Sequence, residues 1–175
     1  MRKIEERVNV SDSKIRGVVV FKRQDGTIVL KKENAIVQNG RKFIRDKFVA
    51  SGIAYLSAFE SGLSTYTLNK IAFGSSDVAT EYDMTELVAQ DDETIVTIDE
   101  VSGAVEAEEG SMFIKFSAEM DRTSLSTGFT VREIGLILED TSESPAADLL
   151  FSRAVFDPIT VAPGEKYQVE YYIYF

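Results

Sequence analysis

The acidic side chains are the residues of this chain with the most evident capacity for chemistry. Three clusters, Asp91-Asp92-Glu93, Asp99-Glu100 and Glu106 to Glu109, carry the carboxylate oxygens that Ca²⁺ and Mg²⁺ prefer as ligands. None has the spacing of a calcium-binding loop, so we interpret them as solvated loops and expect no metal site. Two carboxylates could also hydrolyse a glycosidic bond. Among 29 Asp and Glu residues, however, the sequence singles out no such pair.

Two residue types that carry much of enzyme chemistry are missing from the chain. It contains no histidine and no cysteine, which excludes His-based triads, His-metal sites, thiolate nucleophiles and disulfides. The sequence also lacks the glycine-rich nucleotide-binding motifs and the Gly-x-Ser-x-Gly elbow of serine hydrolases. We therefore expect a protein that is not an enzyme and that needs no cofactor.

The elements that position these side chains are predominantly strands. Gly17–Phe21 and Thr27–Leu30 are rich in β-branched residues and flank Asp25-Gly26, which predicts a hairpin with a positive φ angle at the glycine. A helix is expected from Asn39, because the apolar residues that follow recur at helical spacing. It could continue through Tyr55 to Phe59 before the Ser61–Thr65 break.

Further along the chain, residues 77–93 are acidic and lack periodicity, which predicts a long loop with one short helical turn near Met84 to Val88. Pro158 and Pro163-Gly164 are expected to separate the last two strands. At 175 residues the chain suits one domain. The fold we expect is mainly β, an antiparallel β-sandwich with one packed α-helix, formed by residues 15–175 and preceded by an arm at 1–14. Its later strands are predicted at Leu68–Phe73, Thr94–Val101, Met112–Met120, Val131–Leu138, Leu149–Phe156 and Tyr167–Phe175.

Charge is distributed unevenly between the two parts of the chain. Residues 1–50 carry a balance of +7 and residues 51–175 a balance of −17. The basic side chains of the helix and the hairpin could form one face that meets the acidic face of a neighbouring subunit, and we favour this over nucleic acid, which the acidic remainder would repel. No stretch approaches the ~20 apolar residues of a membrane span. The predicted subunit contacts are Arg41, Lys42, Arg45, Asp91, Asp92, Glu93, Tyr172 and Tyr174.

Six short motifs follow one another in a recognisable order over residues 34–175. Together with the closing aromatic strand they resemble a family of tailed-bacteriophage structural proteins found as tail, baseplate, neck and fibre-base components. The most telling is the Glu-Ile-Gly-Leu strand. The motifs are Asn34-Ala-Ile-Val37 with Asn39-Gly-Arg41, Ile71-Ala-Phe-Gly-Ser75, Asp83-Met-Thr-Glu-Leu87, Arg132-Glu-Ile-Gly-Leu136, Leu150-Phe-Ser-Arg153 and Phe156-Asp-Pro-Ile159.

The resemblance implies a non-enzymatic virion component that assembles in the host cytoplasm. Such a protein forms a ring or small oligomer with copies of itself and connects neighbouring virion proteins. The family pattern brings no catalytic residues, and it does not clearly extend to the N-terminal hairpin and arm. An alternative is a host-receptor or carbohydrate-binding module of a tail fibre, which would use the acidic loop and the exposed tyrosines as its recognition surface.

Overall fold

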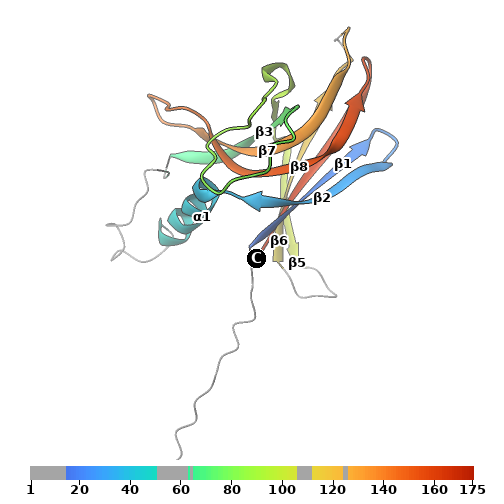
Figure 1. The fold of residues 1–175 in the computed structure, drawn as a ribbon. Helices are drawn as coiled ribbons and strands as arrows, with labels where there is room; N and C mark the ends of the chain where they lie inside the picture. The colour runs from blue at the N-terminus through green and yellow to red at the C-terminus, as the bar shows by residue number, and fades with distance from the viewer. Residues whose placement is uncertain (1–14, 51–62, 64, 106–111, 124–125) are drawn as a thin grey trace, which may run out of the picture.

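A computed structural model describes residues 15–50, 63, 65–105, 112–123 and 126–175 (Figure 1). The arm at 1–14 and the expected helical continuation at 55–59 lie outside the described residues. The hairpin consists of β1 (Arg16–Arg23) and β2 (Ile28–Ile36), and Gly26 in its turn has a φ angle of 85°. The one α-helix of the described residues, α1 (Gln38–Ala50), follows β2 directly. The hairpin, its positive φ angle and the helix are therefore confirmed.

The remaining described elements are strands and one short 3-10 turn, η2 (Asp92–Thr94). Their alternating or continuous apolar residues suit a pleated sheet with one or both faces buried. The strands are β3 (Tyr66–Gly74), β4 (Val96–Thr97), β5 (Glu100–Val105), β6 (Met112–Asp121), β7 (Phe129–Asp140), β8 (Leu149–Val161) and β9 (Lys166–Tyr174).

All nine strands belong to one curled antiparallel sheet in the order β4-β3-β7-β8-β2-β1-β9-β6-β5. The mainly-β fold with one helix is thus confirmed. The two layers expected of a sandwich, β4-β3-β7-β8 and β1-β9-β6-β5, are not separate sheets, because β2 pairs with β1 along most of its length and with β8 at its last two residues.

The two ends of this sheet are brought together by the short connection between β4 and β5. The amide of Ile98 donates to the carbonyl of Asn69 in β3 at 2.8 Å, and the amide of Asp99 donates to the carbonyl of Ser117 in β6, also at 2.8 Å. Two residues in extended conformation span only about 7 Å. Because β4 and β5 lie at opposite ends of the strand order, the sheet must curl almost into a barrel.

The main hydrophobic core fills the space inside the curled sheet. Phe21 of β1 stacks on Tyr167 of β9 with ring centroids 4.8 Å apart, and it also meets Phe73 of β3 at 6.0 Å. These contacts join the two layers across the interior. Helix α1 packs at one end of β8, where Phe43 meets Phe151 edge-on.

Three local predictions are wrong. The helical turn expected at Met84–Val88 is absent from that described segment, and η2 forms later in the loop. The strand expected at Thr94–Val101 is divided into β4 and β5, because the chain crosses between the two ends of the sheet there. Pro158 does not end β8, which continues to Val161. The strand can keep this proline because Pro158 lies at a register shift of the β7–β8 pairing and has no partner on β2.

Candidate assembly surfaces

The acidic loop, defined as residues 75–91, covers the outer face of β7 and β8 (Figure 1). It contains no Lys or Arg. Leu87 is its apolar anchor and is only 4% exposed. It inserts into a second apolar cluster, separate from the main core, that we call the loop cluster. The loop cluster consists of Val37, Ala72, Leu87, Ile137 and Leu150.

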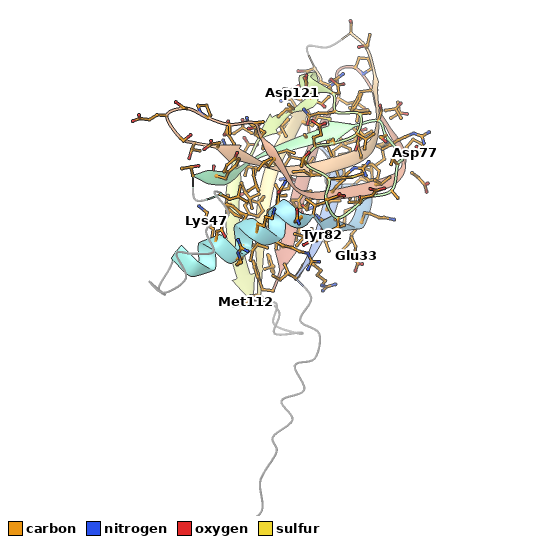
Figure 2. All side chains as sticks on the ribbon, turned by 60° about the vertical axis from the view of Figure 1, so that its left-hand side comes forward. Glu33, Lys47, Asp77, Tyr82, Met112 and Asp121 are labelled. Atoms are coloured by element: carbon orange, nitrogen blue, oxygen red, sulfur yellow. The ribbon has the colours of Figure 1, made fainter. Side chains whose placement is uncertain are left out.

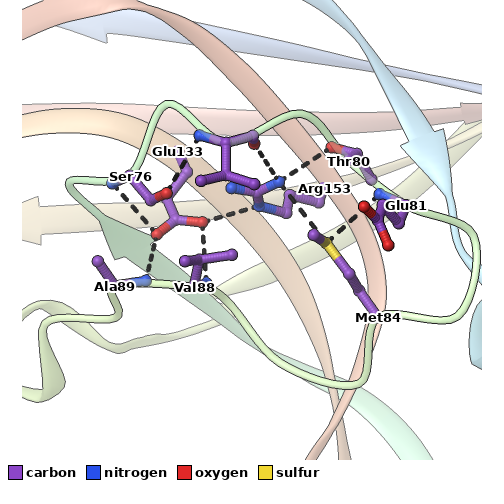
Figure 3. A network of polar contacts seen from close by, with 9 residues as sticks. Ser76, Thr80, Glu81, Met84, Val88, Ala89, Glu133 and Arg153 are labelled. Carbon is purple, nitrogen blue, oxygen red and sulfur yellow. Dashed lines mark hydrogen bonds and ion pairs between the residues drawn. The ribbon is translucent and has the colours of Figure 1, made fainter.

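A buried ion pair beneath the acidic loop holds it in place (Figure 3). Nε of Arg153 on β8 donates to Glu133 on β7 at 2.8 Å, and both side chains are fully buried. The Glu133 carboxylate also accepts hydrogen bonds from the backbone amides of Ala89 at 2.7 Å, Val88 at 3.2 Å and Ser76 at 3.4 Å. One carboxylate thus ties both ends of the loop to the sheet.

We call the Glu133–Arg153 ion pair the clamp, and Arg153 extends its contacts to the middle of the loop. Its Nη1 donates to the carbonyl of Val78 at 2.8 Å and lies 3.3 Å from the hydroxyl of Thr80. A buried charge is costly unless it is paired and hydrogen-bonded. The loop supplies most of these partners, so the ion pair and the loop conformation depend on each other.

Two glycines permit the close approach of the loop to the sheet. A β-carbon on Gly74 would overlap Oε1 of Glu133 and the carbonyl of Ala89. A β-carbon on Gly135 would lie 2.9 Å from a methyl carbon of Leu87 and 2.8 Å from one of Leu150. A larger side chain at Gly74 would displace the loop backbone at Ala89, whereas one at Gly135 would require the side chains of Leu87 and Leu150 to shift.

The basic side chains predicted on the helix lie on α1, but they do not join those of the hairpin turn. Nε of Arg41 donates to the carbonyl of Ile36 at 3.3 Å, and its guanidinium lies 5.8 Å from the ring of Tyr82 in the acidic loop. Lys42 contacts Gln38, and Arg45 pairs with Asp46. The hairpin turn lies at the far end of β2, a strand of nine residues that is about 27 Å long.

The acidic loop and α1 therefore meet within one molecule. Figure 2 shows Tyr82 beside the first turns of α1, and the carbonyl of Tyr82 accepts a hydrogen bond from the amide of Gln38 at 2.7 Å. The basic and acidic parts of the sequence are consequently not two fully separate surfaces. Among the described residues of the basic part, the basic side chains that lie apart from the acidic loop are those near the turn of the β1–β2 hairpin.

The acidic trio predicted as a contact lies where the loop returns to the sheet. The amide of Asp91 donates to the carbonyl of Phe73 at 2.9 Å, and Asp92 accepts a hydrogen bond from Gln90. Glu93 belongs to η2, but its side chain lies outside the described residues. The backbone here is held in place, and the side chain of Asp92 is exposed.

The predicted tyrosines lie on the outer face of β9, where Tyr172 pairs with Val18 and Tyr174 with Arg16 of β1. Tyr172 and Tyr174 are half-buried and form an aromatic patch with Phe113 of β6, with ring centroids 5.5 to 6.2 Å apart. The guanidinium of Arg16 lies 4.6 Å from the ring of Tyr174. Aromatic and Arg side chains of this kind are enriched in the centres of protein interfaces.

Glu170 lies beside the aromatic patch and is held there by charged neighbours. Burial alone would raise the pKa of its carboxyl, but hydrogen bonds from Lys22 at 2.6 Å and from the Tyr172 hydroxyl at 2.9 Å outweigh burial and lower the pKa. The carboxylate is therefore charged at neutral pH and fixes the orientation of Tyr172.

Sequence reasoning missed the clamp and one member of the aromatic patch. Glu133, which follows Arg132, and Arg153 are charged residues within strands that are otherwise mostly apolar, and buried charges require a partner. That signal could have found them. Phe113 offered no comparable signal, because the strand alternation assigns it only to the outer face of β6.

The described residues contain no group of three or more acidic side chains placed to hold a metal ion. No helix in the described part of the chain is long and apolar enough to cross a membrane. Comparison of the chain with known protein families, curated proteins and solved structures found no match.

Proposed function

We propose that this protein is a non-enzymatic structural component of a bacteriophage particle. It assembles into a ring or small oligomer in the tail, neck or baseplate and connects neighbouring virion proteins. The proposal rests on the resemblance of its ordered motifs to tailed-phage structural proteins. Its remaining support comes from where those motifs lie in the fold and from the surfaces that the fold exposes.

The spatial convergence of the motifs carries the proposal. Five of the six supply residues to the loop cluster or the clamp, although they are scattered between residues 34 and 153. Motifs that were alike by chance would have no reason to pack together. These five motifs contribute Val37; Ala72 and Gly74; Leu87; Glu133 and Gly135; and Leu150 and Arg153.

Two differently built outer faces suit the molecule to head-to-tail contacts. The acidic loop covers one layer of the sheet, and the aromatic patch lies on the outside of the other. A contact that joins two different faces is heterologous, and such contacts form rings when the rotation between subunits closes. Aromatic anchors supply affinity, and charges at the rim supply register and salt dependence.

Mass spectrometry of gradient-purified particles tests this function directly. The particles should be those of the phage or prophage that encodes the chain. We expect the protein in intact, nuclease-treated particles at a fixed copy number relative to the major structural proteins. Its absence from particles that contain the other structural proteins would refute the proposal.

Light scattering on the purified full chain tests the self-assembly step. We expect a defined oligomer whose dissociation constant rises between low and high salt, because screening weakens the charged contacts. A monomer at every salt and protein concentration would contradict autonomous self-assembly.

The aromatic patch favours a second function, the binding of a host receptor or carbohydrate by a tail-fibre module. Tyrosine offers a flat apolar ring and a polar tip, which suits sugars as well as proteins. The tyrosines lie on β9 and are connected to the acidic loop through Arg16, which lies 4.6 Å from the ring of Tyr174 and lines one pocket with Glu81 and Tyr82. Saturable glycan or host-cell binding that Tyr172→Ala abolishes and the acidic-loop substitution Asp92→Asn leaves intact would support this function over assembly.

A further inference from the structure

The curled sheet is open between β2 and β8. These strands pair only at Ala35 with Arg153 and at Ile36 with Ser152. From Ile28 to Asn34, β2 is paired with β1 alone, and beyond Ala154 β8 is paired with β7 alone. Two strand edges therefore diverge in the middle of the sheet, each with backbone groups directed away from its one partner strand.

Side chains on both strands agree with an open edge. Lys32 pairs with Val19, which is fully buried, so the alternation of the strand places Lys32 on the inner face. It is nevertheless exposed, whereas its neighbour on that face, Leu30, is half-buried. Pro158 has no backbone N–H; it lies where the pairing of β8 with β7 is interrupted by a register shift and where β2 does not pair with β8.

We propose that the open edge of β2 receives the N-terminal segment, residues 1–14, of a neighbouring copy as an added strand. This inference rests on the self-assembly of the proposed function and names the contact that produces it. An added strand gains affinity from backbone hydrogen bonds and specificity from alternate side chains.

The chemistry of the segment matches this edge. Glu5-Glu6 can face Lys31 and Lys32, which are consecutive and exposed on β2, and Val8-Asn9-Val10 continues with the alternation of a strand. The 14 residues could extend about 45 Å, whereas the seven residues from Ile28 to Asn34 span about 23 Å. The segment is long enough both to reach a neighbour and to pair.

A neighbouring copy is favoured over the same chain by the position of β1. Strand β1 begins opposite Asn34 and occupies the edge of β2 that faces away from β8. To reach the open edge, the chain's own segment would have to pass from the β1 side of β2 to its β8 side near Ala35 and Ile36. At these two residues β2 is hydrogen-bonded to β8, which leaves no gap between the strands. The segment of another copy approaches the open edge from outside.

Lys31 and Lys32 also have a simpler interpretation, as charges that protect an edge from non-specific pairing. The two interpretations differ in what a charge exchange does. If the lysines only protect the edge, their reversal should not weaken a specific oligomer. If they bind the segment, Lys31→Glu with Lys32→Glu should raise the dissociation constant about tenfold, and Glu5→Lys with Glu6→Lys in the same chain should restore it.

The absence of cysteine from the chain allows a direct test by disulfide cross-linking. One preparation of the full chain carries Lys31→Cys, and a second carries a single substitution in the segment, Val8→Cys or Asn9→Cys. The two are mixed under mild oxidation. The matched control replaces the edge substitution by Val101→Cys, which is 58% exposed on β5 at the free end of the sheet.

We expect a mixed dimer from the segment variants with Lys31→Cys and little from those with Val101→Cys. An oligomer of unchanged mass that gives no cross-link at Lys31, or equal cross-links at both positions, would overturn the strand exchange while leaving self-assembly intact. A cross-link within one chain when both substitutions are present together would also overturn it. A monomer under every condition would instead refute self-assembly itself.

Discussion

Removal of the buried arginine of the clamp should strongly destabilise the protein. Arg153→Met leaves the Glu133 carboxylate fully buried with three backbone amides as its remaining partners. Loss of one partner of a buried ion pair typically costs 3–5 kcal/mol. Nη2 of Arg153 already lacks a hydrogen-bond partner among the described residues. We therefore expect the middle of this range, about 4 kcal/mol.

A neighbouring ion pair provides the matched control. Arg132 lies next to Glu133 on β7 and pairs with Asp77 of the same loop at 3.0 Å, but the two side chains are 37% and 74% exposed. Exposed pairs contribute only about 0–1 kcal/mol. Arg132→Met should therefore change the free energy of unfolding by less than about 1 kcal/mol.

Denaturant unfolding followed by circular dichroism measures both free energies, and amide hydrogen exchange reports on the loop. In Arg153→Met the amides of Val88 and Ala89 should exchange much faster than in the parent protein, because they lose a fixed acceptor. The double variant Glu133→Leu with Arg153→Met should recover part of the loss, since it removes both buried charges. A cost below 1 kcal/mol for Arg153→Met with unchanged exchange at Val88 and Ala89 would refute the clamp.

Three further predictions follow from the same structure. Leu87→Ala should cost about 2–4 kcal/mol in the free energy of unfolding, whereas its neighbour Val88, which is 49% exposed, should tolerate alanine within about 0.5 kcal/mol. The Asp140 carboxylate accepts a hydrogen bond from the amide of Ala146, which with Thr65 and Ser142 lowers its pKa to about 2. Its stabilising effect should thus be complete above about pH 4 and be lost as the pH falls toward 2, so the difference in unfolding free energy between the parent and Asp140→Asn should vanish over that interval. Burial raises the pKa of Tyr171 to about 12, and its hydroxyl accepts a hydrogen bond from Ser152 at 3.1 Å. Tyr171→Phe should lower the free energy of unfolding by about 1 kcal/mol. An absorbance titration of this variant should lack one tyrosine that ionises near pH 12 in the parent protein.

Local residue patterns were sufficient to predict most of the elements. The hairpin, the helix and the strands around Ile71, Ile134 and Tyr171 follow from β-branched runs, helical spacing and turn glycines, which act over a few residues. The predictions failed where a distant contact decides the local structure. The segment 94–101 is divided because it must cross between β3 and β6, and β8 passes through Pro158 because that residue lies at a register shift of the β7–β8 pairing and has no partner on β2.

The candidate surfaces divide in the same way. Strand alternation alone assigns Tyr172 and Tyr174 to the outer face of β9, and the structure agrees. Lys22 and Arg23 near the hairpin turn do not join the basic side chains of α1, because a strand of about 27 Å separates the turn from the helix. The sequence offered a signal for the clamp, since charged residues within apolar strands require partners, but it did not indicate that Glu133 and Arg153 are partners, because they lie on different strands.

Composition and short-range periodicity are enough to predict a mainly-β domain without histidine or cysteine chemistry, because they depend on no distant contact. Which charges are buried and which strand edges stay open follow only from the three-dimensional arrangement of the strands. Those properties depend on how a curled sheet brings together residues as far apart in the chain as Ser76 and Arg153. The buried ion pair that fixes the acidic loop and the open edge of β2 are both consequences of that curvature.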